Sequence, residues 1–213
     1  YIADEMITGF KTDFPGSIKK YGVEPDMATW GKGIANGFSF CALTGKKEVM
    51  ELGGIRNTGA EKVFLISTTH GGETHGIAAG LATIDEFINK DVIKHTHSIG
   101  AYLNTACRQV IAAHNLQQHI ELAPCDWMPV FVFKNGNKEV SQGFRTLALQ
   151  EMIKRGVLFQ GVFVPCFSHT KSDIDYLIQA FDETLKVYSQ ALTDGFEKHL
   201  VGEPAKAVFR KFL

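Results

Sequence analysis

Residues 25–37 of the chain read PDMATWGKGIANG, in which one lysine, Lys32, is surrounded by glycines. The residues just before it, 26–30, form a short apolar stretch typical of a buried β-strand that runs into a glycine-rich segment. Because glycine has no side chain, a ligand can approach the backbone closely there. We therefore expect Lys32 to follow the end of a strand and to lie beside a bound ligand.

A lysine at such a position can act as a nucleophilic amine. When it is desolvated, its amine is available to form a Schiff base with a carbonyl compound. A nucleotide-binding P-loop needs the pattern GxxxxGK[ST], and here Gly33 follows the lysine, so that interpretation fails. Local composition alone leaves two alternatives open, a phosphate-binding lysine and an ordinary surface lysine.

Asp4 is the second candidate. It ends the apolar stretch Tyr1–Ala3, where an unpaired carboxylate would be costly and is expected to have a partner. In pyridoxal enzymes a carboxylate holds the ring nitrogen protonated, so that the ring withdraws electrons. Asp4 and Lys32, at the ends of two strands of one sheet, could flank a single planar cofactor. Taken alone, Asp4 could equally be a capping or turn carboxylate.

Two motifs connect these residues to a known family. Residues 4–10 read DEMITGF and resemble the DEVxTGF element of class III aminotransferases, and residues 25–32, PDMATWGK, resemble their PD(L/M)xTxGK element. The separation of Asp4 from Lys32 also matches. The most similar subgroup is that of the glutamate-1-semialdehyde aminomutase-like enzymes. The resemblance continues through residues 68–72 and 168–170 to residues 208–210.

The resemblance implies an α/β fold, that of the fold type I transferases that depend on pyridoxal phosphate. Residues 1–117 would be the C-terminal part of the large mixed-sheet domain with its long connecting helix, and residues 118–213 a small C-terminal α+β domain. The N-terminal half of the protein is then expected to be missing from this chain.

The resemblance also assigns roles at the site. Lys32 would form the Schiff base with pyridoxal 5'-phosphate and move the proton during amino transfer. Asp4 would bind the pyridine nitrogen. Met6, which stands where the family usually has valine, would pack on one face of the ring.

Thr69 belongs to the run TTHGG at residues 68–72, just before a predicted helix. A run of this kind before a helix N-terminus is a ready anion site, although a simple helix-capping run would look the same. Thr69 matches the threonine of the family's GTxxGNP element, while Glu73 and Thr74 stand where Asn-Pro is common. The resemblance implies that Thr69 reaches the cofactor phosphate of the neighbouring subunit, which predicts a homodimer.

No metal site is expected. His70, Glu73 and His75 do not form an HExxH motif, and a helix would not bring them to one face in ligand geometry. The four cysteines lie far apart without a CxxC pair, so we expect reduced and mostly buried thiols: Cys41, Cys107, Cys125 and Cys166.

The composition excludes several partners. The net charge is −1, with 22 basic and 23 acidic residues, so neither nucleic acid nor a membrane surface is expected to bind. The longest apolar runs, such as residues 129–133, are too short to cross a bilayer. No secretory signal opens the chain, and we expect a cytoplasmic protein.

These observations favour a pyridoxal-phosphate-dependent aminotransferase that moves an amino group between an amino donor and a keto or aldehyde acceptor. The alternatives are glutamate-1-semialdehyde 2,1-aminomutase, a related racemase, or a non-catalytic α/β fragment. In the aminomutase subgroup a glutamate faces the active site from a loop that here reads FQGVFVP, residues 159–165, and contains no acid. This difference favours a transaminase. Arg145 and Arg155 could bind a substrate carboxylate, although arginine on a surface helix is the more ordinary interpretation.

Hydrophobic periodicity predicts the remaining elements. Helices are expected over residues 46–52, over 73–114 with a break near Asp91, over 146–155 with a Gly156 cap, and over 172–192 with a serine cap. Strands are expected over residues 38–45, 63–66, 127–134 and 157–159.

Overall fold

The structure, a computed structural model, describes residues 1–54, 61, 69 and 71–206. The chain divides into two compact units, Tyr1–Lys94 and His95–Leu213, which are described separately below. The predicted strand at residues 63–66 lies outside the described residues. Among the residues that the structure describes, no helix is long and apolar enough to cross a membrane.

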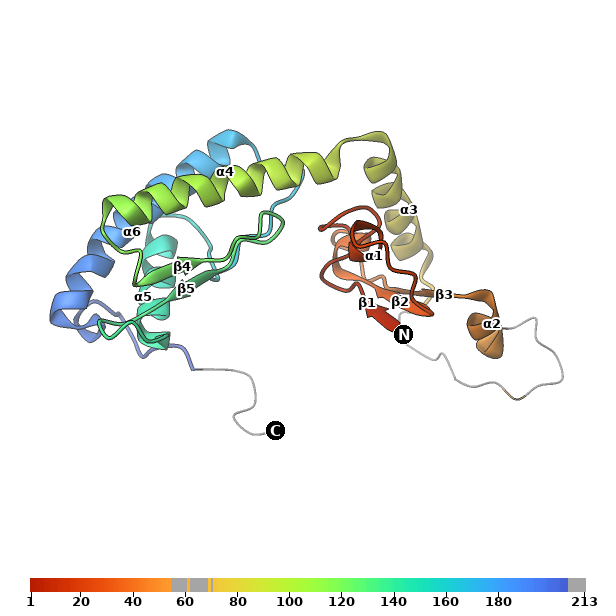
Figure 1. Cartoon of the computed structure of the whole chain (residues 1–213), viewed down its shortest axis with the longest axis horizontal. Helices are drawn as coiled ribbons and strands as arrows, with labels where there is room; N and C mark the ends of the chain where they lie inside the picture. Colours follow the sequence, from red (N-terminus) through yellow and green to blue (C-terminus); the bar gives the residue numbers. More distant parts are fainter. Residues whose placement is uncertain (55–60, 62–68, 70, 207–213) are drawn as a thin grey trace. The chain divides into compact units, whose positions relative to one another are not determined.

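The first unit holds a three-stranded sheet within its described residues, in the order β1 (Ile2–Asp4), β2 (Met27–Trp30), β3 (Ala42–Gly45) (Figure 1). β1 runs parallel to β2 with Asp4 opposite Thr29, and β3 runs antiparallel to β2. Because β1 and β2 are parallel, their carboxyl ends meet at one edge of the sheet. The segments that follow Asp4 and Trp30 therefore start side by side.

Helix α3 (Thr74–Asn89) packs against this sheet through an aromatic cluster. The Phe87 ring lies edge-on to Phe10, with 5.2 Å between ring centroids, and Phe10 in turn meets Trp30 edge-on at 6.3 Å. The described residues of this unit also form four short elements: α1 (Ser17–Lys20), the 3-10 helix η1 (Lys32–Ile34), α2 (Lys47–Met50) and the 3-10 helix η2 (Glu51–Gly53).

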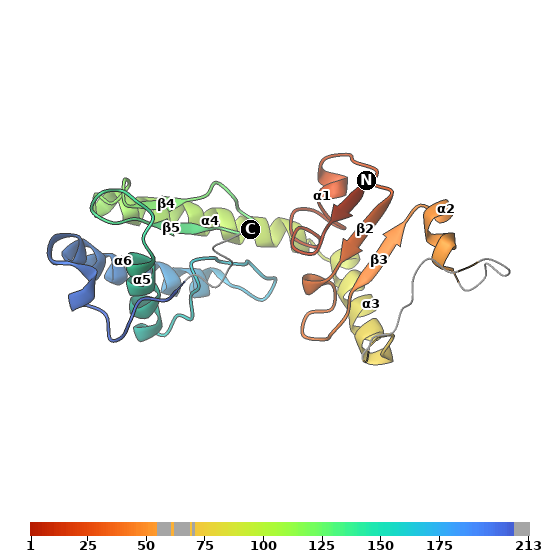
Figure 2. The same cartoon turned by 90° about the horizontal axis from the view of Figure 1, so that it is seen from below.

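The second unit is an α+β arrangement. The antiparallel strands β4 (Ile120–Leu122) and β5 (Phe131–Phe133) lie beside three helices, as Figures 1 and 2 show. The helices are α4 (Val92–Ala113), α5 (Gln142–Lys154) and α6 (Lys171–Asp194), followed by the 3-10 helix η3 (Phe196–Lys198). All of these strands and long helices contribute to one hydrophobic core.

The long helices agree with the predictions better than the strands do. The predicted break near Asp91 is confirmed, because α3 ends at Asn89 and α4 begins at Val92. Helix α6 begins earlier than predicted, with Thr170 and Asp173 in a reciprocal capping box. The predicted strand at residues 157–159 is wrong: Gly156, at φ 77°, turns the chain into an irregular segment. The strand predicted over residues 38–45 is shortened to Ala42–Gly45.

The division into units differs from the predicted boundary at residue 117. Contacts separate the chain after Lys94, since α4 buries Ile99, Leu103 and Cys107 in the core of the second unit. The division of the whole protein at residue 117 remains a prediction. The expectation of mostly buried cysteines is wrong: all four are free, but only Cys107 is buried.

Candidate functional site

Asp4 lies at the carboxyl edge of the sheet with one of its carboxylate oxygens fixed. Its Oδ1 accepts a hydrogen bond from the Met6 backbone amide at 2.9 Å and a longer one from the Thr29 hydroxyl at 3.4 Å. No hydrogen bond to Oδ2 is found within the described part of the chain. The side chain is exposed, so this second oxygen can accept a hydrogen bond from a donor group of a ligand.

Lys32 follows the neighbouring strand and has an unusual backbone. Its φ is +48°, in the left-handed region that residues other than glycine rarely adopt. Strain of this kind is concentrated at functional sites. The Lys32 side chain is exposed, and among the described residues its ammonium makes no hydrogen bond or ion pair. Just before it, buried Trp30 anchors the end of β2 by donating a hydrogen bond from Nε1 to the Thr44 hydroxyl at 2.8 Å.

Met6 packs on the glycine that precedes the lysine. A Cβ built on Gly31 would lie 2.4 Å from the Met6 Cε, so the thioether occupies the space that any side chain at position 31 would need. The structure thus brings Asp4, Met6 and Gly31–Lys32 to the same end of β1 and β2. Three of the four predicted site positions therefore come together in one unit.

Glu5 supports this site and was missed by the sequence analysis. Its side chain is buried, with 1% exposed, although it neighbours the exposed Asp4. Its Oε1 accepts hydrogen bonds from the Ser17 hydroxyl at 2.6 Å and the Ile18 amide at 2.7 Å, and its Oε2 accepts one from the Thr8 hydroxyl.

Burial raises the pKa of Glu5, whereas these hydrogen bonds, led by that from Ser17, lower it, and the net pKa lies below its ordinary value. Glu5 therefore stays ionised and holds the loop after β1 in place. Strand alternation was the available signal, because two adjacent acids at a strand end must face opposite sides of the sheet.

Lys11 also approaches the turn at Lys32. Its ammonium lies 3.5 Å from the position that a Cβ on Gly33 would occupy, and its side chain is half-buried. Burial lowers the pKa of Lys11, and the positive charge of Lys32 lowers it further. No sequence pattern predicts this approach, because it depends on the path of the loop.

Thr69 lies in an exposed turn ahead of α3. No contact among the described residues joins it to Asp4, Met6 or Lys32. His75 pairs with Glu73 at 3.1 Å, while His70 lies outside the described residues. The described part of the chain holds no group of three His, Cys, Asp or Glu side chains that could bind a metal.

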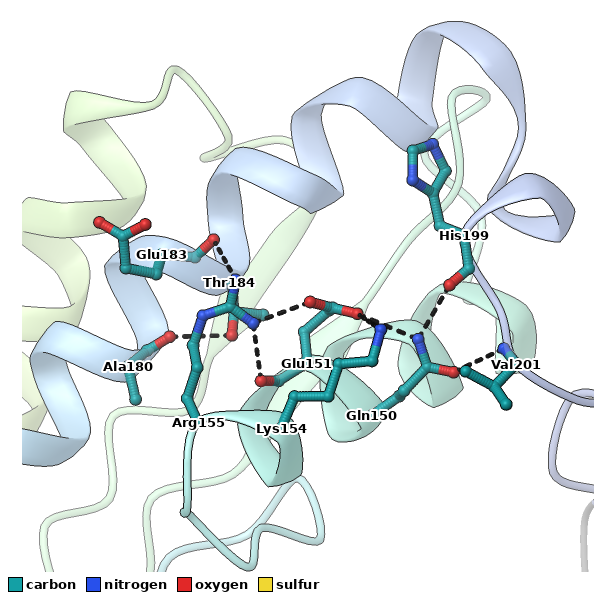
Figure 3. Close-up of polar contacts among 9 residues, drawn as sticks. All are labelled: Gln150, Glu151, Lys154, Arg155, Ala180, Glu183, Thr184, His199 and Val201. Atoms are coloured by element: carbon teal, nitrogen blue, oxygen red, sulfur yellow. Dashed lines mark hydrogen bonds and ion pairs between the residues drawn. The ribbon is translucent and has the colours of Figure 1, made fainter.

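The two arginines considered for a substrate carboxylate are engaged within the second unit. Arg145 donates a hydrogen bond to the Gln160 carbonyl at 2.7 Å. Arg155 donates to the buried carboxylate of Glu151 at 2.8 Å and to the Glu183 carbonyl at 3.4 Å. Figure 3 shows the Glu151 carboxylate between Arg155 on one side and Lys154 on the other. Both arginines serve the packing of α5.

Comparison with known proteins agrees with this arrangement. Residues 1–185 match the family described as Aminotransferase class-III. A 3-aminobutyryl-CoA aminotransferase of Cloacimonas acidaminovorans (strain Evry) is 31% identical over 186 residues, which are 86% of this chain and 43% of that protein. A glutamate-1-semialdehyde 2,1-aminomutase of Staphylococcus epidermidis is 30% identical over 199 residues, covering 86% of this chain and 44% of that protein.

Solved structures show the same fold. An (S)-enantioselective omega-transaminase from Thermomicrobium roseum superposes with a TM-score of 0.72 at 23% sequence identity, over 88% of this chain and 43% of that one. The chain thus spans less than half the length of the proteins it matches. The predicted fold class, part of a fold type I transferase, is confirmed. With the family match extending over most of its length, the chain belongs to the class III aminotransferases.

Proposed function

We propose that the protein containing this chain is a pyridoxal-phosphate-dependent aminotransferase in which Lys32 carries the cofactor. The observation that carries the proposal is the placement of Asp4 and Lys32 at the adjoining ends of two parallel strands. A carboxylate and an amine that share one sheet edge can address opposite ends of the same planar ring. Membership in the class III aminotransferase family supports the same activity.

The residues present fit the cofactor. Asp4 offers one carboxylate oxygen that is fixed by the Met6 amide and a second that accepts no hydrogen bond within the described chain. Such an acceptor suits a protonated ring nitrogen. Lys32 offers an exposed amine on a short, glycine-flanked turn. Met6 supplies an apolar, polarisable surface between them.

When bound, pyridoxal phosphate supplies an electron-withdrawing ring that stabilises negative charge at the carbon next to the substrate amine. Asp4 would keep that ring in its protonated form and orient it. The Lys32 amine would take a proton from the substrate carbon and return it elsewhere, and holding this amine in place contributes to the rate. Met6 would limit the movement of the ring against the sheet.

We further propose a homodimer in which Thr69 binds the cofactor phosphate of the partner subunit. Thr69 is exposed in a turn that leads toward the N-terminus of α3, which supports an anion-binding role. We also propose that the protein works in the cytoplasm, because its four cysteines are free thiols, which a reducing compartment preserves.

A second candidate is glutamate-1-semialdehyde 2,1-aminomutase activity, in which the amine returns to the same molecule. The similarity to the Staphylococcus epidermidis aminomutase favours it. The loop at residues 159–165 favours a transaminase instead, because it contains no acid and its Val162 and Val164 are exposed apolar side chains. Adding an amino donor without an acceptor separates the two: a transaminase releases a keto acid or aldehyde, whereas an aminomutase yields the rearranged amine.

The test of the first proposal is the attachment site of the cofactor in the whole protein. Mixed with pyridoxal phosphate and reduced with borohydride, the wild type should carry the cofactor on the tryptic peptide that contains Lys32. Lys32→Ala should lose both this label and the visible absorbance of the lysine-bound cofactor, while Lys20→Ala, on exposed α1, should keep both. A wild type without cofactor absorbance, or a label on another lysine, would refute the proposal.

A further inference from the structure

The lysine segment, residues 31–40, has a strained backbone at several positions. Besides Lys32 at φ 48°, Asn36 lies at φ 34° and Gly37 at φ 104°, all in the left-handed region. Two backbone hydrogen bonds within the segment span 3.2 and 3.4 Å, at or beyond the long end of the ordinary range. Strained backbone persists only where the surrounding structure holds it, so contacts from outside the segment must contribute.

Helix α3 supplies such contacts, because two of its glycines let the lysine segment lie directly on the helix. A Cβ built on Gly76 would lie 2.9 Å from the Ser39 carbonyl oxygen, which is too close for a real side chain. A Cβ built on Gly80 would lie 2.9 Å from the Phe40 ring and 3.7 Å from the Ile34 carbonyl oxygen. The segment therefore touches α3 at two points, about one helical turn apart.

The contact with α3 reaches the immediate neighbours of Lys32. Ile34 ends the 3-10 helix that begins at Lys32, and it is 5% exposed. Ala35 is buried as well, and the half-buried Phe40 packs against the aromatic cluster that contains Trp30. The exposed Lys32 therefore has buried residues close to it on both sides along the chain. A shift of the segment on α3 would move the backbone from which the Lys32 side chain extends.

We propose that the contact between α3 and the lysine segment positions Lys32, with Gly76 and Gly80 as positioning residues that act through its backbone. This inference rests on the proposed function of Lys32. In that function the neutral amine condenses with the aldehyde of pyridoxal phosphate, forming a C=N bond and releasing one water. The condensation depends on where the amine is held. A side chain at position 76 would push the Ser39 carbonyl away from α3, and Lys32 could then relax from its left-handed conformation.

The experiment compares two ligands of the whole protein, pyridoxal phosphate and pyridoxamine phosphate. They share the ring and the phosphate, but pyridoxamine phosphate has an amine in place of the aldehyde and forms no bond with a lysine. Calorimetric titration gives a Kd for each ligand, and thermal unfolding gives the stability of the cofactor-free protein. The variants are Gly76→Ala, Gly80→Ala and the double variant Gly80→Ala with Phe40→Leu. Gly136→Ala is the control, since nothing lies within 4 Å of its new Cβ.

Gly76→Ala and Gly80→Ala should each weaken pyridoxal phosphate by about 10-fold, because relief of the overpacked contact moves the lysine segment. Pyridoxamine phosphate should change by less than about 2-fold, since its binding does not use the Lys32 amine. Phe40→Leu removes ring atoms that the new Cβ of Gly80→Ala meets, so the double variant should bind pyridoxal phosphate within about 3-fold of the wild type. Gly136→Ala should resemble the wild type.

Equal weakening of both ligands would show a general disturbance of the site and would overturn the positioning role. Wild-type affinity for pyridoxal phosphate in the folded glycine variants would overturn it too, as would a double variant as weak as Gly80→Ala. Gly80→Ala keeps the test decisive if Gly76→Ala does not fold, because the Phe40 ring can shift more readily than the Ser39 carbonyl.

A wild type that does not attach pyridoxal phosphate at Lys32 would instead refute the proposed function. The two failures are therefore distinguishable.

Discussion

Replacing Glu151 with Gln should destabilise the second unit in a pH-dependent way. The Glu151 side chain is 6% exposed and accepts hydrogen bonds from Lys154 at 2.7 Å, Arg155 at 2.8 Å and Gln150 at 3.0 Å (Figure 3). Burial raises the pKa of Glu151, but these bonds outweigh burial and lower it from 4.5 to about 2. That difference corresponds to about 3 kcal/mol of folding free energy.

The sign follows from the lowered pKa. Because the folded protein holds the ionised carboxylate more tightly than the unfolded chain, the stabilisation is complete well above pH 4.5 and is lost as the pH falls through about 2. At about pH 3 the wild type has already lost about 2 of these 3 kcal/mol. Gln resembles the protonated acid. The difference in unfolding free energy between wild type and Glu151→Gln should therefore narrow from about 3 kcal/mol at neutral pH to about 1 kcal/mol at about pH 3.

Hydrogen exchange of the α5 amides in the whole protein measures this gap locally, after correction for the slower intrinsic exchange in acid. Glu183→Gln is the control, since its ion pair with Lys186 is about half exposed on both sides and should contribute less than about 1 kcal/mol. Equal protection of wild type and Glu151→Gln at neutral pH would refute the reasoning. A gap that stays constant between neutral pH and about pH 3 would refute it as well.

Two further predictions concern packing. Burial raises the pKa of the Cys107 thiol to about 12, whereas Cys41 and Cys166 are exposed. A thiol reagent should therefore label Cys41 and Cys166 in the native protein and leave Cys107 unlabelled until the protein unfolds, as mass spectrometry of the peptides would show. Labelling of Cys107 at the rate of Cys41 would contradict this prediction. Gly31→Ala should weaken pyridoxal phosphate binding by about 10-fold, because the new Cβ meets Met6 at 2.4 Å and overpacking costs about 1–3 kcal/mol. Adding Met6→Ala should recover the affinity in an absorbance titration, and a double variant as weak as Gly31→Ala would argue against the contact.

The parts of the fold that could be predicted from the sequence were those with a repeating local pattern. Helices α3 and α4 carry apolar residues at helical spacing over many turns, so both were recognised together with the break between them. The three residues 157–159 are apolar and β-prone, but a strand exists only if another strand pairs with it, and composition cannot show that. Helix α5 begins at Gln142, four residues before the prediction, although its Ser141 cap was visible in the sequence.

At the site, motifs identified Asp4, Met6 and Lys32, and the structure brings these three together. Their roles, and that of Thr69, remain predictions. Glu5 could have been recognised from strand alternation together with the hydroxyl-bearing residues that follow it. Lys11 could not, because its approach to Gly33 depends on how the intervening loop closes.

The adjacent acids Asp4 and Glu5 also constrain how β1 can change its length. Asp4 is exposed at the proposed site and Glu5 is 1% exposed in the interior, so their order decides which carboxylate serves as scaffold. A deletion or insertion of one residue within β1 would preserve both acids but exchange the faces on which they lie. The shorter side chain, that of Asp4, would then face the Ser17 hydroxyl, and the longer side chain of Glu5 would face the ligand. Length variation in this strand is therefore tolerable only in steps of two, a parity rule that neither acid would impose alone.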